Sequence, residues 1–294
     1  MEKERVIIVT GAGGFVGSRF ITYNRSKYKI IPLSLREKKL DHISWENIDA
    51  VVHLAGKAHE MKPIPDEIYY EINYDLTKEL ALHARAQKVP HFIYISSTKV
   101  YGDVINHTLN ESSACHPTDP YGKSKRQAEE FLLGIASDDF KVAIIRPPLV
   151  YGPRVKGNMI KLLKLSDSGF PLPFGNMDNY RSMVFVDNLI ELINTIIRQQ
   201  AHGVFVAGDL QPVSTGFLVS TMRKDLHKAR NLLSVPGVLK KLIKKIRPAL
   251  YERLYGSFVV NNEQTNQQLS FTPPYTTEQG IKEMVDWYKG KAHS

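Results

Sequence analysis

The chain has 294 residues, of which 43% are hydrophobic and 23% charged, so its composition is that of a globular protein with a sizeable core. One cysteine, Cys115, excludes an internal disulfide, and the scattered histidines lack metal-ligand spacing. The sequence has no signal-peptide pattern and no apolar run long enough to cross a membrane, which predicts a cytoplasmic protein.

Strand and helix signals alternate through the first half of the chain. A β-branched run at 6–9 begins a series of strands, which we expect at 6–9, 30–35, 50–54, 91–96 and 142–145. Helices are expected between them, at 15–25, 70–87 and 121–135. Alternation of this kind favours a parallel sheet covered on both faces. The sequence therefore predicts a doubly wound α/β (Rossmann) fold.

The alternation breaks after Arg146, where prolines and glycines intervene. A strand at 184–186 and a helix at 187–198 are expected to return to the sheet domain. We therefore assign residues 1–150, plus about 183–200, to a dinucleotide-binding domain. Residues 151–182 and 201–294 are assigned to a smaller mixed α/β substrate domain. The periodic apolar face of a helix at 278–288 is expected to close that second domain.

A glycine-rich turn lies between the first strand and the first helix. Gly11, Gly14 and Gly17 permit a tight turn, close approach of a pyrophosphate and close packing of helix on strand. The helix N-terminus, at Phe15 and Val16, then faces the phosphates with free amides. The turn predicts a dinucleotide site. The alternative is an ordinary glycine-rich turn.

The end of the second strand bears on the choice between NAD and NADP. An acidic residue there usually binds the ribose hydroxyls of NAD. Here Ser34 and Arg36 occupy that place, and a hydroxyl and a guanidinium suit a 2′-phosphate better. We expect NADP or NAD as the cofactor, with a lean to NADP(H). The alternative is that Arg36 is simply solvated.

Three residues form a candidate catalytic group. Tyr121 and Lys125 are four apart at a helix start, so they share one helix face. A nearby ammonium and an oxidised nicotinamide favour the phenolate, which could exchange a proton with a sugar hydroxyl or carbonyl. Ser97 directly follows the strand expected at 91–96 and could orient the same oxygen. The alternative is that Tyr121 merely packs at the helix start.

The chain resembles the extended short-chain dehydrogenases, the family of sugar-nucleotide epimerases and dehydratases. The matching segments are TGAGGFVG (10–17), HLAG (53–56), Asn73 with Thr77, SSTKVYG (96–102), YGKSK (121–125), RPPLVYGP (146–153), Arg181 with VFVDN (184–188), and TPPYTTEQGIKEMVDWY (272–288). The resemblance implies NAD(P) binding, a Ser97–Tyr121–Lys125 triad and a UDP-sugar or similar substrate in the second domain. It also implies cofactor contacts from Leu54, Ala55, Gly56, Asn73 and Pro148, although Asn73 is alternatively structural, bridging backbone groups near the catalytic helix.

Two departures from the family pattern matter. In the 4,6-dehydratases an Asp-Glu pair follows the catalytic hydroxyl, whereas this chain has Thr98 and Lys99. Because a lysine cannot replace the carboxylate, we disfavour elimination chemistry and expect Thr98 to contact substrate beside Ser97. The third strand of the fold is compressed between Lys39 and Ile48, which leaves the adenine contacts open.

Similarity within the family points to bacterial enzymes of surface-polysaccharide synthesis, and two activities stay open. The first is an NADPH-dependent 4-keto reduction of a UDP-N-acetyl-6-deoxyhexosamine. We favour it because no acidic residue stands at the end of the second strand. The second is 4-epimerisation of UDP-glucose or UDP-N-acetylglucosamine with retained NAD. A third possibility is a non-catalytic, cofactor-sensing protein, but such proteins usually lack the tyrosine or the lysine, and Tyr121 and Lys125 are both present.

Two residues of the second half are candidate substrate ligands. Asn158 suits a uracil or a phosphate oxygen, and the alternative is a helix cap. Arg181 suits a bidentate contact with the pyrophosphate, and the alternative is a surface ion pair.

The segment 236–246 predicts a basic amphipathic helix. Apolar residues at 238, 239, 242, 243 and 246 oppose lysines at 240, 241, 244 and 245. We expect the apolar stripe to pack on the core. The alternative is weak peripheral contact with an anionic membrane. No aromatic platform accompanies the charge, so we expect no nucleic acid. The family resemblance also predicts a homodimer, with the helices at 70–87 and 121–135 as candidate interface elements.

Overall fold

A six-stranded parallel sheet forms the centre of the fold. The computed structural model describes residues 4–36, 40–58, 64–102 and 108–292. The sheet has the order β2-β1-β3-β4-β5-β8, and every neighbouring pair is parallel. Its strands are β1 (Arg5–Thr10), β2 (Tyr28–Leu33), β3 (Ala50–His53), β4 (His91–Ile95), β5 (Lys141–Arg146) and β8 (Gly203–Val206). The doubly wound α/β prediction is confirmed.

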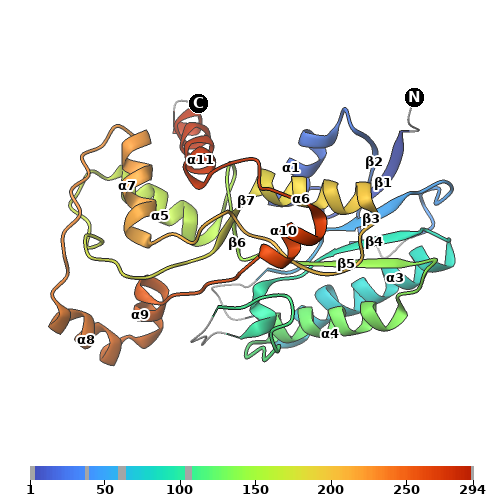
Figure 1. Ribbon diagram of the computed structural model, residues 1–294, viewed down its shortest axis with the longest axis horizontal. Helices are drawn as coiled ribbons and strands as arrows, with labels where there is room; N and C mark the ends of the chain where they lie inside the picture. The colour runs from blue at the N-terminus through green and yellow to red at the C-terminus, as the bar shows by residue number, and fades with distance from the viewer. Residues whose placement is uncertain (1–3, 37–39, 59–63, 103–107, 293–294) are drawn as a thin grey trace.

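Helices cover both faces of this sheet (Figure 1). On one face lie α1 (Phe15–Asn24) and α6 (Val186–Gln199), and on the other lie α3 (Leu76–Ala86) and α4 (Pro120–Ile135). Alternate strand residues supply the two cores, so that Ile7 joins the first cluster and Ile8 the second. The inner strands β3, β4 and β5 are buried on both sides, as is usual for a parallel sheet.

A compact loop replaces a strand between β2 and β3. Leu40, Trp45 and Ile48 are buried there and pack beneath α3 in the second core cluster. The indole Nε1 of Trp45 donates to the carbonyl of Leu40 at 2.8 Å, which closes the loop on itself. Over the described residues 40–49 no strand forms, in agreement with the compressed segment of the sequence.

Two short strands differ from the sequence assignment. β7 (Met183–Phe185) pairs with β6 (Leu149–Tyr151) in a separate two-stranded sheet, although the sequence had led us to expect the strand at 184–186 in the main sheet. β8 pairs instead with β5, so residues 203–206 belong to the main sheet and not to the substrate domain. Only three residues separate the end of α6 from the start of β8, so the chain returns directly to the edge of the main sheet.

The remaining helices build the second region of the molecule. These are α5 (Gly157–Asp167), α7 (Thr215–Asp225), α8 (Gly237–Ile246), α9 (Pro248–Tyr255) and α11 (Thr277–Ala292), whereas α10 (Glu263–Leu269) packs on α6 beside the main sheet. α11 packs on α7, and its Ile281, Met284 and Val285 are fully buried, which confirms the expected apolar face. The buried carboxylate of Asp209 accepts bonds from Tyr151 Oη and Asn188 Nδ2, both at 2.7 Å.

α8 exposes part of the apolar stripe that we expected to pack on the core. Val238, Leu242 and Ile246 of its apolar stripe are exposed, at 82%, 49% and 65%. Lys240 is half-buried and lies over the ring of Tyr255 of α9, and the exposed Lys244 lies over the ring of Tyr251. The prediction of a core-packed stripe is therefore wrong for these three residues, whereas Ile243 of the same stripe is half-buried. None of the helices in the described ranges is long and apolar enough to cross a membrane.

Candidate active site

The glycine turn is packed too tightly to admit side chains at two of its positions. Gly11 has φ +68°, and a Cβ there would lie 2.6 Å from the backbone nitrogen of Ala55. A Cβ on Gly17 would lie 2.1 Å from the carbonyl oxygen of Gly11. A Cβ on Gly13 would meet nothing within 4 Å, so the turn is open on its outer side. The turn is thus fixed against the β3 end and open to a ligand.

The N-terminus of α1 fits a diphosphate. Its N-cap is Gly14, with no side-chain cap bond, and its first turn carries no acidic residue. The first-turn amides and the positive end of the helix dipole are therefore left to an anion. Gly13 and Gly14 are exposed, so a diphosphate can approach them. These features suit the diphosphate of a dinucleotide.

A buried histidine, to which we had assigned no role from the sequence, connects the turn to the helical layer. His53 Nδ1 contacts Thr10 Oγ1 at 2.6 Å, and Nε2 contacts Thr77 Oγ1 at 2.9 Å. The hydroxyl of Thr10 also accepts from the backbone of Ala55 at 3.2 Å. Burial lowers the pKa of His53 to about 3, so the ring is neutral and serves as a bridge. The HLAG motif and Thr77 were the signals that could have identified it.

Ser97 and Tyr121 meet at the carboxyl edge of the sheet. Ser97 lies two residues after the end of β4 and caps η2 (Thr98–Tyr101), accepting from the backbone of Lys99 at 3.2 Å. Tyr121 lies in the first turn of α4. Burial raises the pKa of Tyr121, and its hydrogen bond with Ser97 acts in the opposite direction. The ring centroids of Tyr69 and Tyr121 are 6.2 Å apart.

Lys125 lies one helical turn further along α4, buried against the sheet. Its Nζ donates to the carbonyl of Ile95 at 2.9 Å and sits 4.6 Å from the ring centroid of Tyr94. A Cβ on Gly56 would lie 3.1 Å from this Nζ, so the glycine leaves room for the ammonium. Burial lowers the pKa of Lys125 to about 7, while the carboxylate of Glu129 raises it. Ser97 and Tyr121 are thus hydrogen-bonded, and Lys125 lies one turn further along α4 beside the end of β4, from which Ser97 follows.

The start of α4 is fixed by local sequence. Pro120 stands in its first turn, and the N-cap Asp119 accepts from the backbone of Gly122 at 2.7 Å. Asp119 also pairs with Lys99, with 3.2 Å between Oδ2 and Nζ. Thr98 is buried and Lys99 is engaged by that carboxylate, so neither of the two positions offers an acid or base of the dehydratase kind.

Asn73 connects the catalytic helix to the strand edge. It lies in η1 (Glu71–Asp75), a π-helical turn between α2 (Asp66–Tyr70) and α3, and π turns occur often at functional sites. Its Oδ1 accepts from the backbone of Lys57 at 2.7 Å, and its Nδ2 donates to Ser124 Oγ at 3.1 Å. This is the bridging role named above as the structural alternative. Contact with a cofactor stays a prediction.

The predicted substrate ligands lie further from these groups in the chain. Asn158 is exposed at the second position of α5, and the N-cap of that helix is Lys156, so the helix-cap alternative is wrong. The guanidinium of Arg181 donates to two carbonyls at the end of α9, those of Glu252 at 2.6 Å and Gly256 at 3.0 Å. Burial lowers the pKa of Arg181. Arg181 thus binds a helix end rather than a surface carboxylate.

The end of β2 lies beside the glycine turn. Thr10 pairs with Leu33 in the sheet, so Ser34 and Arg36 follow at the same edge. Both are exposed, while Leu35 between them is buried. Pro148 is buried just after β5. Two neighbouring segments lie outside the described residues: 37–39, which follow β2, and 59–61, which follow the HLAG motif.

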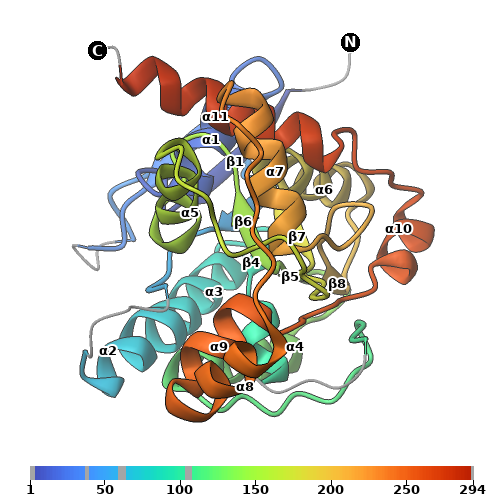
Figure 2. The ribbon, with the colours of Figure 1, turned by 90° about the vertical axis from the view of Figure 1, so that its left-hand side faces the viewer.

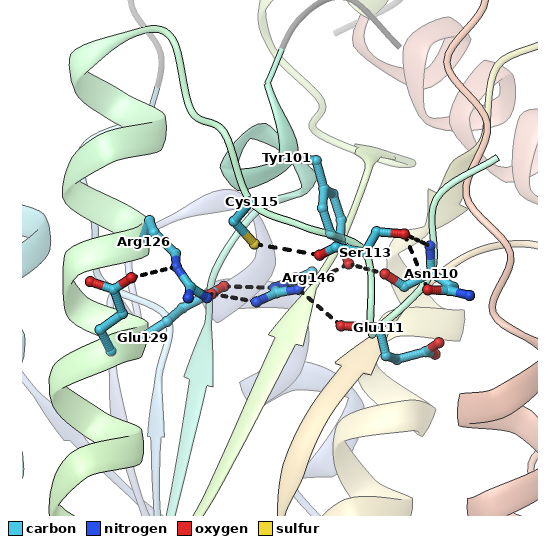
Figure 3. Close-up of polar contacts among 9 residues, drawn as sticks. Tyr101, Asn110, Glu111, Ser113, Cys115, Arg126, Glu129 and Arg146 are labelled. Atoms are coloured by element: carbon cyan, nitrogen blue, oxygen red, sulfur yellow. Dashed lines mark hydrogen bonds and ion pairs between the residues drawn. The ribbon is translucent and has the colours of Figure 1, made fainter. Parts of the chain in front are cut away.

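A buried ion pair holds α4 against β5 (Figure 3). Arg146 at the end of β5 bonds Glu129 of α4 through Nε at 3.0 Å and Nη2 at 2.7 Å. The side chain of Glu129 is 0% exposed and that of Arg146 is 3% exposed. Arg146 also donates to Tyr101 Oη at 3.1 Å. Glu129 stands one turn after Lys125, so this pair fixes the helix that carries the candidate catalytic residues.

Comparison with known proteins identifies relatives over nearly the whole chain. A sequence model of the NAD dependent epimerase/dehydratase family matches residues 7–208. The UDP-glucose 4-epimerase of Vibrio cholerae is 35% identical, over 94% of this chain and 93% of that protein. The N-acetyl-alpha-D-glucosaminyl-diphospho-ditrans,octacis-undecaprenol 4-epimerase of Escherichia coli O157:H7 is 28% identical, over 96% of this chain and 94% of that protein.

Solved structures share the fold. The UDP-glucuronic acid 4-epimerase from Bacillus cereus, in complex with NAD, matches with a TM-score of 0.76 at 20% identity, covering 97% of this chain and 99% of that one. RMD from Pseudomonas aeruginosa, complexed with NADPH, matches with a TM-score of 0.79 at 20% identity and the same coverage. At this identity the likeness supports the fold.

We predict that Gly17→Ala disrupts the glycine turn. The new Cβ would overlap the Gly11 carbonyl, so the turn must shift, with a lower melting temperature and dinucleotide binding at least about tenfold weaker. Gly134→Ala is the control, because a Cβ there meets nothing within 4 Å. Thermal unfolding measures the melting temperature of each variant, and a binding titration measures its dinucleotide affinity. Dinucleotide affinity equal to that of the parent would refute the steric argument.

We predict that Arg146→Met destabilises the fold by about 3–5 kcal/mol, because it leaves the buried Glu129 carboxylate without its main partner. Denaturant unfolding measures the change. Lys282→Met, which breaks an exposed pair with Asp286, is the control and should cause no measurable change. Removing both charges with Glu129→Leu and Arg146→Met should recover part of the loss. An unchanged stability of Arg146→Met contradicts the role of the pair.

Proposed function

The chain belongs to the NAD-dependent epimerase/dehydratase family, and on that premise we propose that it is a 4-epimerase of a nucleotide-diphosphate sugar. The observation that carries the proposal is the convergence of Ser97, Tyr121 and Lys125 at the sheet edge beside the glycine turn. A phenol, a hydroxyl and a buried ammonium at one point suit proton transfer to a sugar oxygen.

In the proposed mechanism each residue has a separate task. A bound NAD(P) supplies a hydride acceptor and donor at its nicotinamide ring. Tyr121 takes the proton of the sugar C4 hydroxyl when hydride leaves C4, and returns it when hydride comes back. Ser97 bonds the same oxygen and holds it in line with the phenol. The ammonium of Lys125 binds ribose hydroxyls and favours the phenolate by its charge.

The residues after Ser97 argue against loss of water from the sugar. Elimination needs an acid and a base placed over C5 and C6, and the corresponding positions here are Thr98 and Lys99. Lys99 is paired with Asp119, which also caps α4. We therefore propose hydride and proton transfer without elimination, although dehydratases belong to the same family.

Two relatives named 4-epimerases, which this chain matches over more than nine-tenths of its length, favour epimerisation. One is named for UDP-glucose and the other for a diphosphate-linked N-acetylglucosaminyl lipid. We propose that the substrate is a sugar diphosphate, the group that both of these names contain. Arg181 would be a ligand of the diphosphate and Asn158 a ligand of the nucleotide. For Arg181 this requires that the guanidinium exchange at least one α9 carbonyl for a phosphate oxygen.

A 4-keto reductase using NADPH is the second candidate. Ser34 and Arg36 favour it, because both are exposed at the end of β2, where a 2′-phosphate would lie. Its substrate would be a UDP-N-acetyl-6-deoxyhexosamine with a keto group at C4. The same three residues would act, but the reductase would release oxidised cofactor after each turnover, while an epimerase retains it.

We also propose that the chain forms a homodimer through α3 and α4. These helices pack side by side, and each exposes a large apolar residue, Leu82 at 43% and Leu133 at 40%. A four-helix interface between two copies would bury both.

We predict that the protein interconverts UDP-glucose and UDP-galactose, or their N-acetylated forms, without added reductant. Chromatography of the sugar nucleotides measures the product. Tyr121→Phe should lower kcat at least about a hundredfold, because the phenolic proton carrier is lost. Tyr70→Phe, on α2, is the matched control and should be active. Consumption of NADPH by a 4-keto-6-deoxy sugar, without epimerisation, would instead select the reductase. Activity of Tyr121→Phe equal to the parent would overturn the mechanism.

We predict that dinucleotide affinity falls as the pH rises. Burial lowers the pKa of Lys125 to about 7, and only its ammonium form donates to ribose hydroxyls, so binding draws on the protonated state. In protein freed of bound dinucleotide, calorimetry should show roughly a tenfold or greater rise in Kd between about pH 6 and 8.5. Lys125→Met should bind weakly at both pH values, without this step. A flat profile in the parent protein would count against the role of the ammonium.

A further inference from the structure

α8 carries a row of three exposed apolar side chains. Val238, Leu242 and Ile246 are spaced four residues apart, so they form one row along the helix. All three are exposed, at 82%, 49% and 65%. In Figure 1, α8 and α9 form the lower left corner of the molecule, away from the main sheet, and in Figure 2 they lie at the bottom of the molecule. The row therefore lies on an outer surface.

Specific contacts hold α8 in this orientation. The Nζ of Lys240 donates to the carbonyl of Asn176 at 2.7 Å and lies 5.3 Å from the ring centroid of Tyr255. The Nζ of Lys244 lies 5.3 Å from the ring centroid of Tyr251. Both distances suit cation–π contact. These contacts attach the lysine side of α8 to α9 and to Asn176, and the apolar row lies on the other side of the helix.

Two more lysines border the row on the outside. At 100° per residue, Lys241 and Lys245 fall on the side of the helix next to Val238 and Leu242, and both are exposed. Apolar residues flanked by lysines on one helix are the pattern that binds a bilayer interface, with the side chains in the acyl boundary and the ammonium groups at the phosphates.

We propose that α8 docks this protein on an anionic lipid bilayer, with Val238, Leu242 and Ile246 inserted and Lys241 and Lys245 on the headgroups. A second copy of the chain fits this surface less well, because two like-charged faces would meet, and the chain carries a net charge of +9. An anionic surface matches both the charge and the apolar row. This docking does not depend on the proposed epimerase activity.

The docking helix is also linked to the candidate substrate region. α8 packs on α9, and Arg181 bonds the carbonyls at the end of α9. If Arg181 binds the sugar diphosphate, as proposed above, then the same side chain contacts both the substrate and α9, on which α8 packs. Docking would then place the substrate region close to the membrane surface.

Co-sedimentation of the full-length protein with vesicles tests the proposal. Binding is expected to vesicles containing phosphatidylglycerol, to fall at high salt, and to be weak with phosphatidylcholine alone. Lys241→Glu with Lys245→Glu should weaken binding at least about tenfold, because each lysine near an anionic surface is worth about fivefold. Leu242→Ser with Ile246→Ser should also weaken binding, and at both salt concentrations.

Matched controls separate this surface from general effects. Leu210→Ser changes a leucine of similar exposure, 57%, outside α8. Lys29→Glu with Lys224→Glu makes the same change in net charge on other elements. Both variants should bind vesicles like the parent, and all variants should retain the parent's melting temperature. Loss of binding in these controls, or no vesicle binding by the parent, would overturn the proposal. So would self-association that the Leu242→Ser and Ile246→Ser pair abolishes while vesicle binding persists.

Discussion

The buried ammonium of Lys125 is the contact on which the candidate site depends. It draws α4 against the carboxyl end of β4 by donating to the carbonyl of Ile95. A charge so far from water is costly, and the lowered pKa of Lys125 reflects that cost. Three features make the position tolerable: the carbonyl, the face of the Tyr94 ring and the carboxylate of Glu129. Tyr121 then lies one turn away, bonded to Ser97.

The surrounding structure can be understood as support for that contact. Gly56 leaves space above the ammonium, and Asn73 ties the segment after β3 to α4 through Lys57 and Ser124. Arg146 neutralises Glu129 from β5. The glycine turn lies at the same carboxyl edge of the sheet. Groups suited to a dinucleotide and groups suited to proton transfer therefore lie on one side of the sheet.

Much of this was predictable from sequence because the relevant signals are local. The β-branched runs, the glycine turn and the Tyr-Lys spacing each fix a backbone shape or a helix face by themselves. β8 was missed because four residues give too short a signal, and its pairing with β5 is set by the return of the chain after α6. The exposure of Val238, Leu242 and Ile246 of α8 was missed because the pattern of an amphipathic helix does not say which side has a partner. In the structure, Tyr251 and Tyr255 of α9 contact the lysine side of the helix. The bridge through His53 likewise joins residues that are distant in sequence.

A crystal structure with bound dinucleotide and a UDP-hexose tests the central claim most directly. The account predicts that the sugar O4 lies within hydrogen-bond distance of both Tyr121 Oη and Ser97 Oγ, with Lys125 on the nicotinamide ribose. A sugar whose C4 lies away from Tyr121, or a dinucleotide bound elsewhere than over the glycine turn, would contradict it.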